Sequence, residues 1–106
     1  MKMHQIDTDY TVLKILKDNP AMTQRQLSKE LGLSLGKTNY VLHALIDKGL
    51  MKLSNFKRSN NKVGYLYILT PEGIEEKSIL AKNFLERKSA EYFKLKNEIE
   101  ILKREL

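Results

Sequence analysis

Residues 23–51 read TQRQLSKELGLSLGKTNYVLHALIDKGLM, and this stretch decides the fold. Thr23 and Gln26 match the S/T-x-x-E/Q capping box that begins a helix. Gly32 supplies the left-handed turn that ends this helix, and Ser34 caps a second helix directly afterwards. The stretch therefore predicts two short helices joined by a glycine turn, which is a helix-turn-helix.

The second of these helices is expected to run from Ser34 to about Lys48, where Gly49 stops it. Its apolar positions recur at spacings of three and four and predict one buried stripe: Thr38, Val41, Leu42 and Leu45. The opposite face is then polar and open to a partner. The candidate contact residues on this helix are Ser34, Gly36, Lys37, Thr38, Asn39, Tyr40 and His43.

The flanking segments complete a small domain. Residues 8–18 predict an earlier helix, capped by Thr8 or Asp7 and ended by Asn19-Pro20. After the helix-turn-helix, residues 50–55 and 65–69 predict two strands rich in β-forming residues. The polar run KRSNNK at residues 57–62 lies between them. These segments predict a β-hairpin with a basic tip.

The C-terminal third predicts one long helix. Thr70-Pro71-Glu72 combines a hydroxyl cap, a proline at the first helical position and an acid near the positive end of the helix dipole. No proline or glycine follows Gly73, so the helix is expected to exceed thirty residues. Apolar residues then recur at heptad a and d positions. The candidate dimerisation residues are Leu85, Tyr92, Leu95, Ile99, Leu102 and Leu106.

Charges beside this heptad stripe predict a parallel pair of helices. A parallel arrangement places Glu91 opposite Lys96 of the other copy, and Glu98 opposite Lys103. An antiparallel arrangement would place like charges together. We also expect residues 74–84 to pack on the body of the domain. The alternative is a single amphipathic helix that folds back on its own domain.

The fold class predicted is mainly α with a small β-hairpin (α+β). A winged helix-turn-helix domain at residues 1–70 is followed by a coiled-coil helix at residues 71–106. The formal charge of +6 belongs to the first unit. Residues 1–70 hold 11 Lys and Arg against 5 Asp and Glu, whereas residues 71–106 hold 8 of each. A positive patch on so small a domain is typical of a polyanion-binding protein.

Composition argues against several other functions. The chain has no cysteine, and His4 and His43 lie far apart, so neither a disulfide framework nor a metal site is predicted. No catalytic or phosphate-loop constellation is recognisable, and we expect no enzyme activity and no cofactor. No apolar run is long enough to cross a bilayer, and no signal peptide is recognisable, so a cytoplasmic protein without membrane contact is expected.

The second helix of the helix-turn-helix carries the chemistry of a DNA-reading element. Its first turn has open backbone N–H groups, and Lys37 stands where an acid would weaken their positive field. Gly36 permits close approach to a sugar-phosphate backbone. Lys37 and Asn39 suit guanine and adenine edges, and Tyr40 and His43 can add polar or stacking contacts. The hairpin residues expected on the minor groove or flanking phosphates are Lys57, Arg58, Asn60, Asn61 and Lys62.

Simpler interpretations exist for three of these residues. Gly36 is also compatible with a merely tolerated glycine, Tyr40 with packing on the hairpin, and His43 with a plain surface position. At the level of function, the alternatives are a winged domain that docks proteins and an RNA-binding module. The polar, basic helix face disfavours protein docking. A symmetric dimer favours a pseudo-palindromic double-stranded DNA site over RNA.

From Thr23 to Leu106 the chain also resembles the MarR-type winged helix-turn-helix regulators. The similarity is greatest to the subgroup associated with exopolysaccharide gene clusters. The segments that carry it are SLGKTNYVLHALIDKGLMK, NFKRSNNKVGYLYILTPEGIEEK and FLERKSAEYFKLKNEIEILKRE. The resemblance implies a dimeric transcription regulator, with residues 34–43 in the recognition helix and residues 57–62 in the wing.

The chain departs from the broader MarR pattern at its N-terminus. Typical members interlock N- and C-terminal helices into a dimer that encloses a ligand pocket. Here the N-terminal extension is nearly absent, so the C-terminal helix alone is expected to dimerise. The resemblance therefore does not extend to a small-molecule pocket, and the effector stays unknown.

Overall fold

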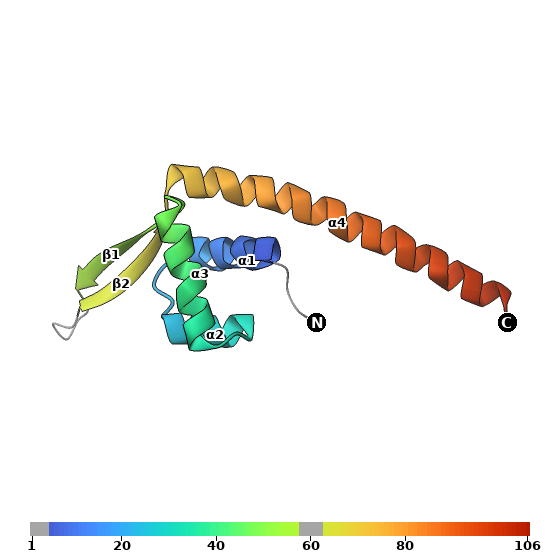
Figure 1. Cartoon of the computed structure of the whole chain (residues 1–106), viewed down its shortest axis with the longest axis horizontal. Helices are drawn as coiled ribbons and strands as arrows, with labels where there is room; N and C mark the ends of the chain where they lie inside the picture. The colour runs from blue at the N-terminus through green and yellow to red at the C-terminus, as the bar shows by residue number, and fades with distance from the viewer. Residues whose placement is uncertain (1–4, 58–62) are drawn as a thin grey trace.

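The computed structural model of the chain describes residues 5–57 and 63–106. Its elements within these residues are α1 (Gln5–Asp18), α2 (Gln24–Leu31), α3 (Leu35–Asp47), β1 (Met51–Lys57), β2 (Val63–Leu69) and α4 (Pro71–Arg104). Helices α1 to α3 form a bundle, the hairpin projects from one end of it, and α4 crosses over α1 and continues past it (Figure 1). The molecule is accordingly elongated, with extents of 66 × 26 × 22 Å.

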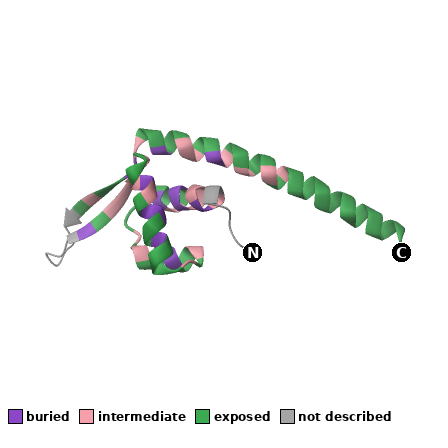
Figure 2. Ribbon diagram, in the orientation of Figure 1, coloured by how far each residue is buried: buried purple, intermediate pink, exposed green. Residues whose placement is uncertain are grey.

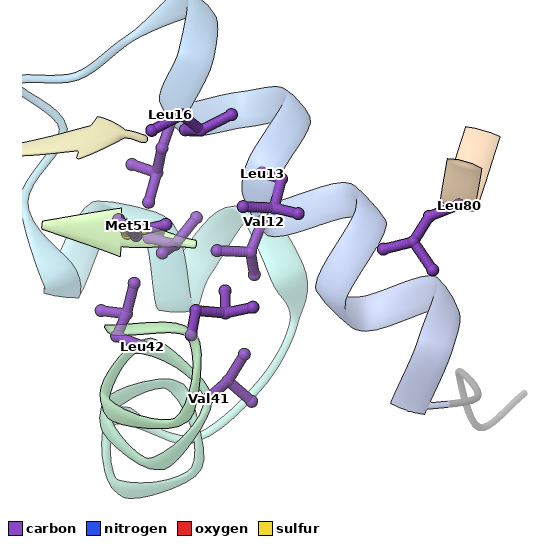
Figure 3. Close-up of a cluster of buried hydrophobic side chains, with 10 residues drawn as sticks. Val12, Leu13, Leu16, Val41, Leu42, Met51 and Leu80 are labelled. Atoms are coloured by element: carbon purple, nitrogen blue, oxygen red, sulfur yellow. The ribbon is translucent and has the colours of Figure 1, made fainter. Parts of the chain in front are cut away.

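One apolar core joins all six elements. Its members are Val12, Leu13, Leu16, Leu27, Val41, Leu42, Leu45, Met51, Leu69 and Leu80. The α1 side chains lie at the centre, between α3 and Met51 on one side and Leu80 of α4 on the other (Figure 3). The stripe predicted for α3 is confirmed, because Thr38, Val41, Leu42 and Leu45 are all buried.

The helix-turn-helix forms through the predicted local signals. The Thr23 hydroxyl accepts from the Gln26 N–H, and the Gln26 side chain accepts from the Thr23 N–H, at 3.1 and 2.9 Å. Gly32 ends α2 with φ 68°, a left-handed conformation that glycine enters without steric cost. Ser28 of α2 is buried, and its hydroxyl donates to the Gln24 carbonyl one turn back at 2.9 Å. These contacts fix the entry of the chain into α3.

The hairpin is longer than the sequence predicted. Strands β1 and β2 pair antiparallel from Met51 opposite Leu69 to Lys57 opposite Val63. The expected strands ended at Asn55 and began at Tyr65, so two more residues are paired at the outer end of each strand. The additional pairs are Phe56 with Gly64 and Lys57 with Val63, and their pairing depends on the register between the two strands, which the composition of either strand alone does not give.

The first helix also begins earlier than expected. Helix α1 starts at Gln5, so Thr8 lies inside the helix, where it is buried, and is not the cap. Asp7 is not the cap either and occupies the first turn, where a carboxylate interacts favourably with the helix dipole. Its carboxylate pairs with Arg87 of α4. The prediction of a cap at Thr8 or Asp7 was therefore wrong.

Helix α4 begins where the sequence predicted. The Thr70 hydroxyl accepts from the Gly73 N–H at 3.0 Å and donates to the Gly49 carbonyl at 2.6 Å. Gly73 lies so close to the preceding turn that a Cβ there would stand 1.9 Å from the Leu50 carbonyl oxygen. The predicted packing of residues 74–84 is confirmed at Leu80 and Phe84, which contact the core and α1, whereas Ile74 stays 46% exposed.

The far half of α4 is not covered by any other part of the described chain. Every residue from 91 to 106 is exposed, and Figure 2 shows this half of the helix green along its length. The predicted fold class, mainly helical with a small antiparallel hairpin and a long C-terminal helix, is confirmed. The boundary between two units, predicted between residues 70 and 71, stays a prediction. The coiled coil stays a prediction as well. Among the described residues, no helix has the length and apolar character needed to cross a membrane.

Candidate nucleic-acid interface

The start of α3 is held by its own cap and from inside the domain. The Ser34 hydroxyl accepts from the Lys37 N–H at 3.1 Å. The Thr38 hydroxyl donates to the Ser34 carbonyl at 2.9 Å, and Thr38 has no exposed surface. Thr38 therefore cannot touch a partner on the outside, which removes it from the predicted contact residues. Its role is to anchor the first turn of α3.

Five of the other predicted residues form an exposed surface on α3, which we call the reading face. Its members are Gly36, Lys37, Asn39, Tyr40 and His43. The Tyr40 side chain is 71% exposed, which excludes the alternative that it packs on the hairpin. A Cβ at Gly36 would meet no described atom within 4 Å, so the domain's own packing does not require glycine there.

The electrostatic field at the start of α3 favours an anion. The first turn of a helix carries backbone N–H groups without intrahelical partners and the positive end of the dipole. No acidic residue lies in the first turn of α3, and Lys37 adds a positive charge to it. A phosphate oxygen or an electronegative base edge would be attracted to this end of the reading face.

A groove of about 450 Å³ separates the reading face from the hairpin. Asn39 and His43 line its α3 side, and Leu53, Gly64, Tyr65 and Tyr67 line its hairpin side. Residues 21–24, which lead into α2, close one end. Asn39 and His43 are thus brought together with the hairpin, whereas Lys37 and Tyr40 do not line this groove.

Sequence reasoning missed the two tyrosines of this groove. Tyr65 is 54% exposed, and Tyr67 is half-buried. Burial, together with the neighbouring Tyr65, raises the pKa of Tyr67. A signal was present, because alternation along β2 places Tyr65 and Tyr67 on the same face of the strand as buried Leu69.

The predicted hairpin-tip residues are described only at the edge of the tip. Lys57 ends β1, and its backbone pairs with Val63, but its side chain lies outside the described part of the structure. Arg58, Asn60, Asn61 and Lys62 lie outside the described residues. Strands β1 and β2 project from one end of the helical bundle beside α3, as the strands of a wing do (Figure 1).

The predicted dimerisation residues lie on the uncovered part of α4. Their exposed fractions are 65% for Leu85, 59% for Tyr92, 56% for Leu95, 43% for Ile99, 59% for Leu102 and 107% for Leu106. Tyr92, Leu95, Lys96 and Ile99 surround a shallow hollow of about 190 Å³, which Glu100 also borders. So many exposed apolar side chains along one helix are unusual on a monomer.

Comparison with known proteins agrees with this architecture. Residues 7–51 match the family model described as winged helix-turn-helix DNA-binding. No curated protein sequence matches the chain at a significant level.

Several solved structures share the fold at low sequence identity. Staphylococcus aureus MarR, solved in complex with salicylate and kanamycin, superposes with a TM-score of 0.61 at 17% identity over 91% of this chain and 67% of its own. A transcriptional regulator homologue from Pyrococcus horikoshii gives 0.62 at 18% identity, over 85% and 90% respectively. A variant of Lactococcus lactis ZitR gives 0.64 at 23% identity, over 86% and 60%.

The chain spans 60% of the ZitR chain and 90% of the Pyrococcus one. At these identities the comparison concerns the fold alone. Residues 7–51 thus match the winged helix-turn-helix model, and the chain shares its fold with solved structures that include Staphylococcus aureus MarR.

Proposed function

We propose that the chain is a transcription regulator of MarR type that binds a specific double-stranded DNA site as a parallel homodimer. The observation that carries the proposal is the reading face. It is exposed, its first turn contains Lys37 but no acid, and it lies at the positive end of α3 inside a winged helix-turn-helix. A protein-docking winged domain would instead present an apolar or acidic surface at this place.

Each part of the interface has a separate task in this proposal. Ser34 and the open N–H groups of α3 receive a phosphate, and Gly36 lets the backbone approach closely. Lys37 and Asn39 read base edges in the major groove, with Tyr40 and His43 as further contacts. The wing, with Lys57, Arg58, Asn60, Asn61 and Lys62, binds the minor groove or adjacent phosphates.

The uncovered half of α4 supports the dimer in this proposal. Helices in proteins gain most of their stability from packing of an apolar face, and a second copy would cover the exposed stripe of α4. The hollow among Tyr92, Leu95, Lys96 and Ile99 has the a-d-e-a composition of the hole that receives a d-position side chain in a parallel coiled coil. Leu95 of a second copy fits this hole. The pairing of Glu91 with Lys96 and of Glu98 with Lys103 supports the same orientation.

A parallel dimer carries two reading faces related by two-fold symmetry, which matches a pseudo-palindromic operator. The resemblance in the hairpin and α4 segments supports genes of the exopolysaccharide type as targets, and such a regulator works in the cytoplasm. A reporter fused to the upstream DNA of such a cluster, with and without the regulator, tests the choice of target and gives the sign of regulation.

Gel-shift titration tests DNA binding itself. The purified chain is mixed with its own upstream DNA at several salt concentrations and competed with random duplex and with RNA. We expect retarded DNA that resists random competitor and weakens steeply with salt, because lysine–phosphate contacts release counterions. Binding to RNA alone, or to no nucleic acid, would contradict the proposal and favour one of the other modules.

Substitutions separate base reading from phosphate binding. Asn39→Ala is expected to relax preference at one base pair and cost about 1–3 kcal/mol on the specific site only. Lys57→Ala or Lys62→Ala is expected to weaken binding to all duplexes and reduce the slope of log K against log salt by about one. Equal losses on every sequence for all three variants would contradict this division.

A further inference from the structure

Helix α4 makes a second contact with the body beyond the core. The rings of Tyr10 and Phe84 stack with their centroids 5.5 Å apart and an interplanar angle of 29°. One turn further along α4, the Arg87 guanidinium donates to both carboxylate oxygens of Asp7, with Nη1 3.2 Å from Oδ2 and Nη2 on Oδ1. Helix α1 is therefore joined to α4 by an aromatic stack and a two-pronged ion pair.

The geometry of this ion pair restricts the angle between α1 and α4. A guanidinium and a carboxylate that bond through two parallel N–H groups are constrained in angle as well as distance. The Asp7 side chain is only 14% exposed, whereas Arg87 is 39% exposed. The guanidinium carbon of Arg87 also lies 5.8 Å from the centroid of the Phe84 ring. Arg87 therefore contacts both the aromatic stack and Asp7. The hydrogen bond to Asp7 raises the pKa of Arg87 above its ordinary value.

Because of the position of this contact along α4, a small change in the angle of the helix moves its far end by a large distance. Gly73 rests on the Leu50 carbonyl, Leu80 enters the core, and Arg87 makes the contact nearest to the exposed residues 91–106. At the helical rise per residue, Leu106 lies about 39 Å beyond Leu80. A tilt of about 10° around Leu80 would therefore move Leu106 by about 7 Å, which is comparable to the length of two base pairs of B-DNA.

We propose that Asp7 and Arg87 are positioning residues that lock the direction of α4, and thereby determine which spacing between two DNA half-sites the dimer accepts. The second half of this inference rests on the proposed function. In it, neither residue touches DNA. Both act through the angle between the winged domain and the dimer helix, which sets the distance between the two reading faces.

The first experiment measures the lock without DNA. The chain has no cysteine, so Asp47→Cys and Lys94→Cys place one spin label at the end of α3 and one on the exposed part of α4. Labelled chains are diluted with unlabelled chains, so that electron-electron resonance reports the distance within one copy. We expect a narrow distribution in the parent and a distribution at least twice as wide after Arg87→Gln.

Variants separate the lock from loss of charge or stability. Asp7→Asn should widen the distribution as Arg87→Gln does, and the double variant should add little, because each change removes the same contact. The Arg87→Lys variant retains one bond, and its distance distribution should be intermediate in width between those of the parent and Arg87→Gln. Arg104→Gln removes an equal charge near the end of α4, and its distance distribution should be as narrow as that of the parent. An unchanged width in both Arg87→Gln and Asp7→Asn would overturn the proposal.

The second experiment measures spacing on DNA. The best binding site is isolated from a random duplex pool, and variants are made with one or two base pairs added to or removed from its centre. The parent is expected to lose at least tenfold in affinity on a two-pair change, and Arg87→Gln less than threefold, while Arg104→Gln follows the parent. An identical spacing profile for Arg87→Gln and the parent would overturn the role in spacing.

The two proposals fail in different ways. If the parent binds no duplex but Arg87→Gln widens the distance distribution, the lock is supported and the DNA-binding function is contradicted. If the parent binds DNA with a sharp spacing preference and neither readout responds to Arg87→Gln, the function stands and the lock is wrong.

Discussion

At the scale of single residues, the closest contact at the base of α4 predicts a strict requirement for glycine. A Cβ at position 73 would lie 1.9 Å from the Leu50 carbonyl oxygen, which belongs to backbone and cannot rotate away. We expect Gly73→Ala to shift the start of α4 and to cost about 1–3 kcal/mol of unfolding free energy, as overpacking does. Urea denaturation of both proteins measures the difference.

Gly36 is the matched control for this substitution. A Cβ there would meet no described atom within 4 Å, so Gly36→Ala should leave the fold intact or stabilise it by about 0.5–1 kcal/mol through lower chain entropy. If Gly36 faces a sugar-phosphate backbone as proposed, the same variant should nevertheless bind DNA more weakly. Equal destabilisation by both substitutions would show that the contact at Leu50 is not what selects glycine.

The residue scale also shows where sequence reasoning succeeds. Exposure of Lys37, Asn39 and His43 followed from excluding the apolar stripe of α3, because helical periodicity assigns faces without tertiary information. Thr38 was assigned to both the stripe and the contact set, and its burial resolves the conflict. Tyr67 was missed as a groove residue, because the groove exists only where the hairpin approaches α3.

At the scale of elements, the junction between the hairpin and α4 depends on one hydroxyl. Thr70 caps α4 through the Gly73 N–H and also bonds the Gly49 carbonyl, 21 residues earlier. Thr70→Val keeps the shape but leaves both backbone groups without this partner, and we expect a loss of about 1–2 kcal/mol. The shift in the thermal midpoint measures the loss.

Ser78→Ala provides the comparison for Thr70. Its hydroxyl donates only to the Ile74 carbonyl one turn back, at 3.3 Å on an exposed face, so its removal should cost little. A Ser78→Ala loss as large as that of Thr70→Val would indicate that general helix propensity, not the junction, explains the effect.

Helix ends that depend on contacts within a few residues were predicted correctly. The capping box at Thr23, the left-handed turn at Gly32 and the cap at Thr70 each act within a few residues, and each appears in the structure as predicted. The outer limits of β1 and β2 were not predicted, because they depend on register between two strands. The start of α1 at Gln5 was also missed, and so was the contact of Asp7 with Arg87, because it joins residues 80 positions apart.

At the scale of the whole molecule, a compact three-helix body carries a helix whose outer half has no partner within the described chain (Figure 2). The heptad pattern could be recognised from sequence, because it repeats along one element. The contacts that set the angle of α4 could not, since Tyr10 with Phe84 and Asp7 with Arg87 join segments distant in sequence. The heptad stripe of α4 was thus predictable from sequence, whereas the angle at which α4 leaves the body was not.

Two isoleucines test whether the heptad seam assembles the molecule. Ile99 and Ile101 are exposed to nearly the same degree, 43% and 45%, but only Ile99 occupies an a position, whereas Ile101 lies at c on the outer side of a parallel pair. Ile99→Asp would bury an unpaired charge in the seam, so we expect a monomer by sedimentation at micromolar concentration. Ile101→Asp should remain a dimer.

The same pair of variants connects assembly to DNA. If affinity for a two-half-site duplex depends on dimerisation, Ile99→Asp should lose at least tenfold on that duplex while binding a single half-site as the parent does. Ile101→Asp should match the parent on both. Equal dissociation of both variants would mean that the apolar surface of α4 associates without a heptad register, and a monomeric parent would contradict the dimer itself.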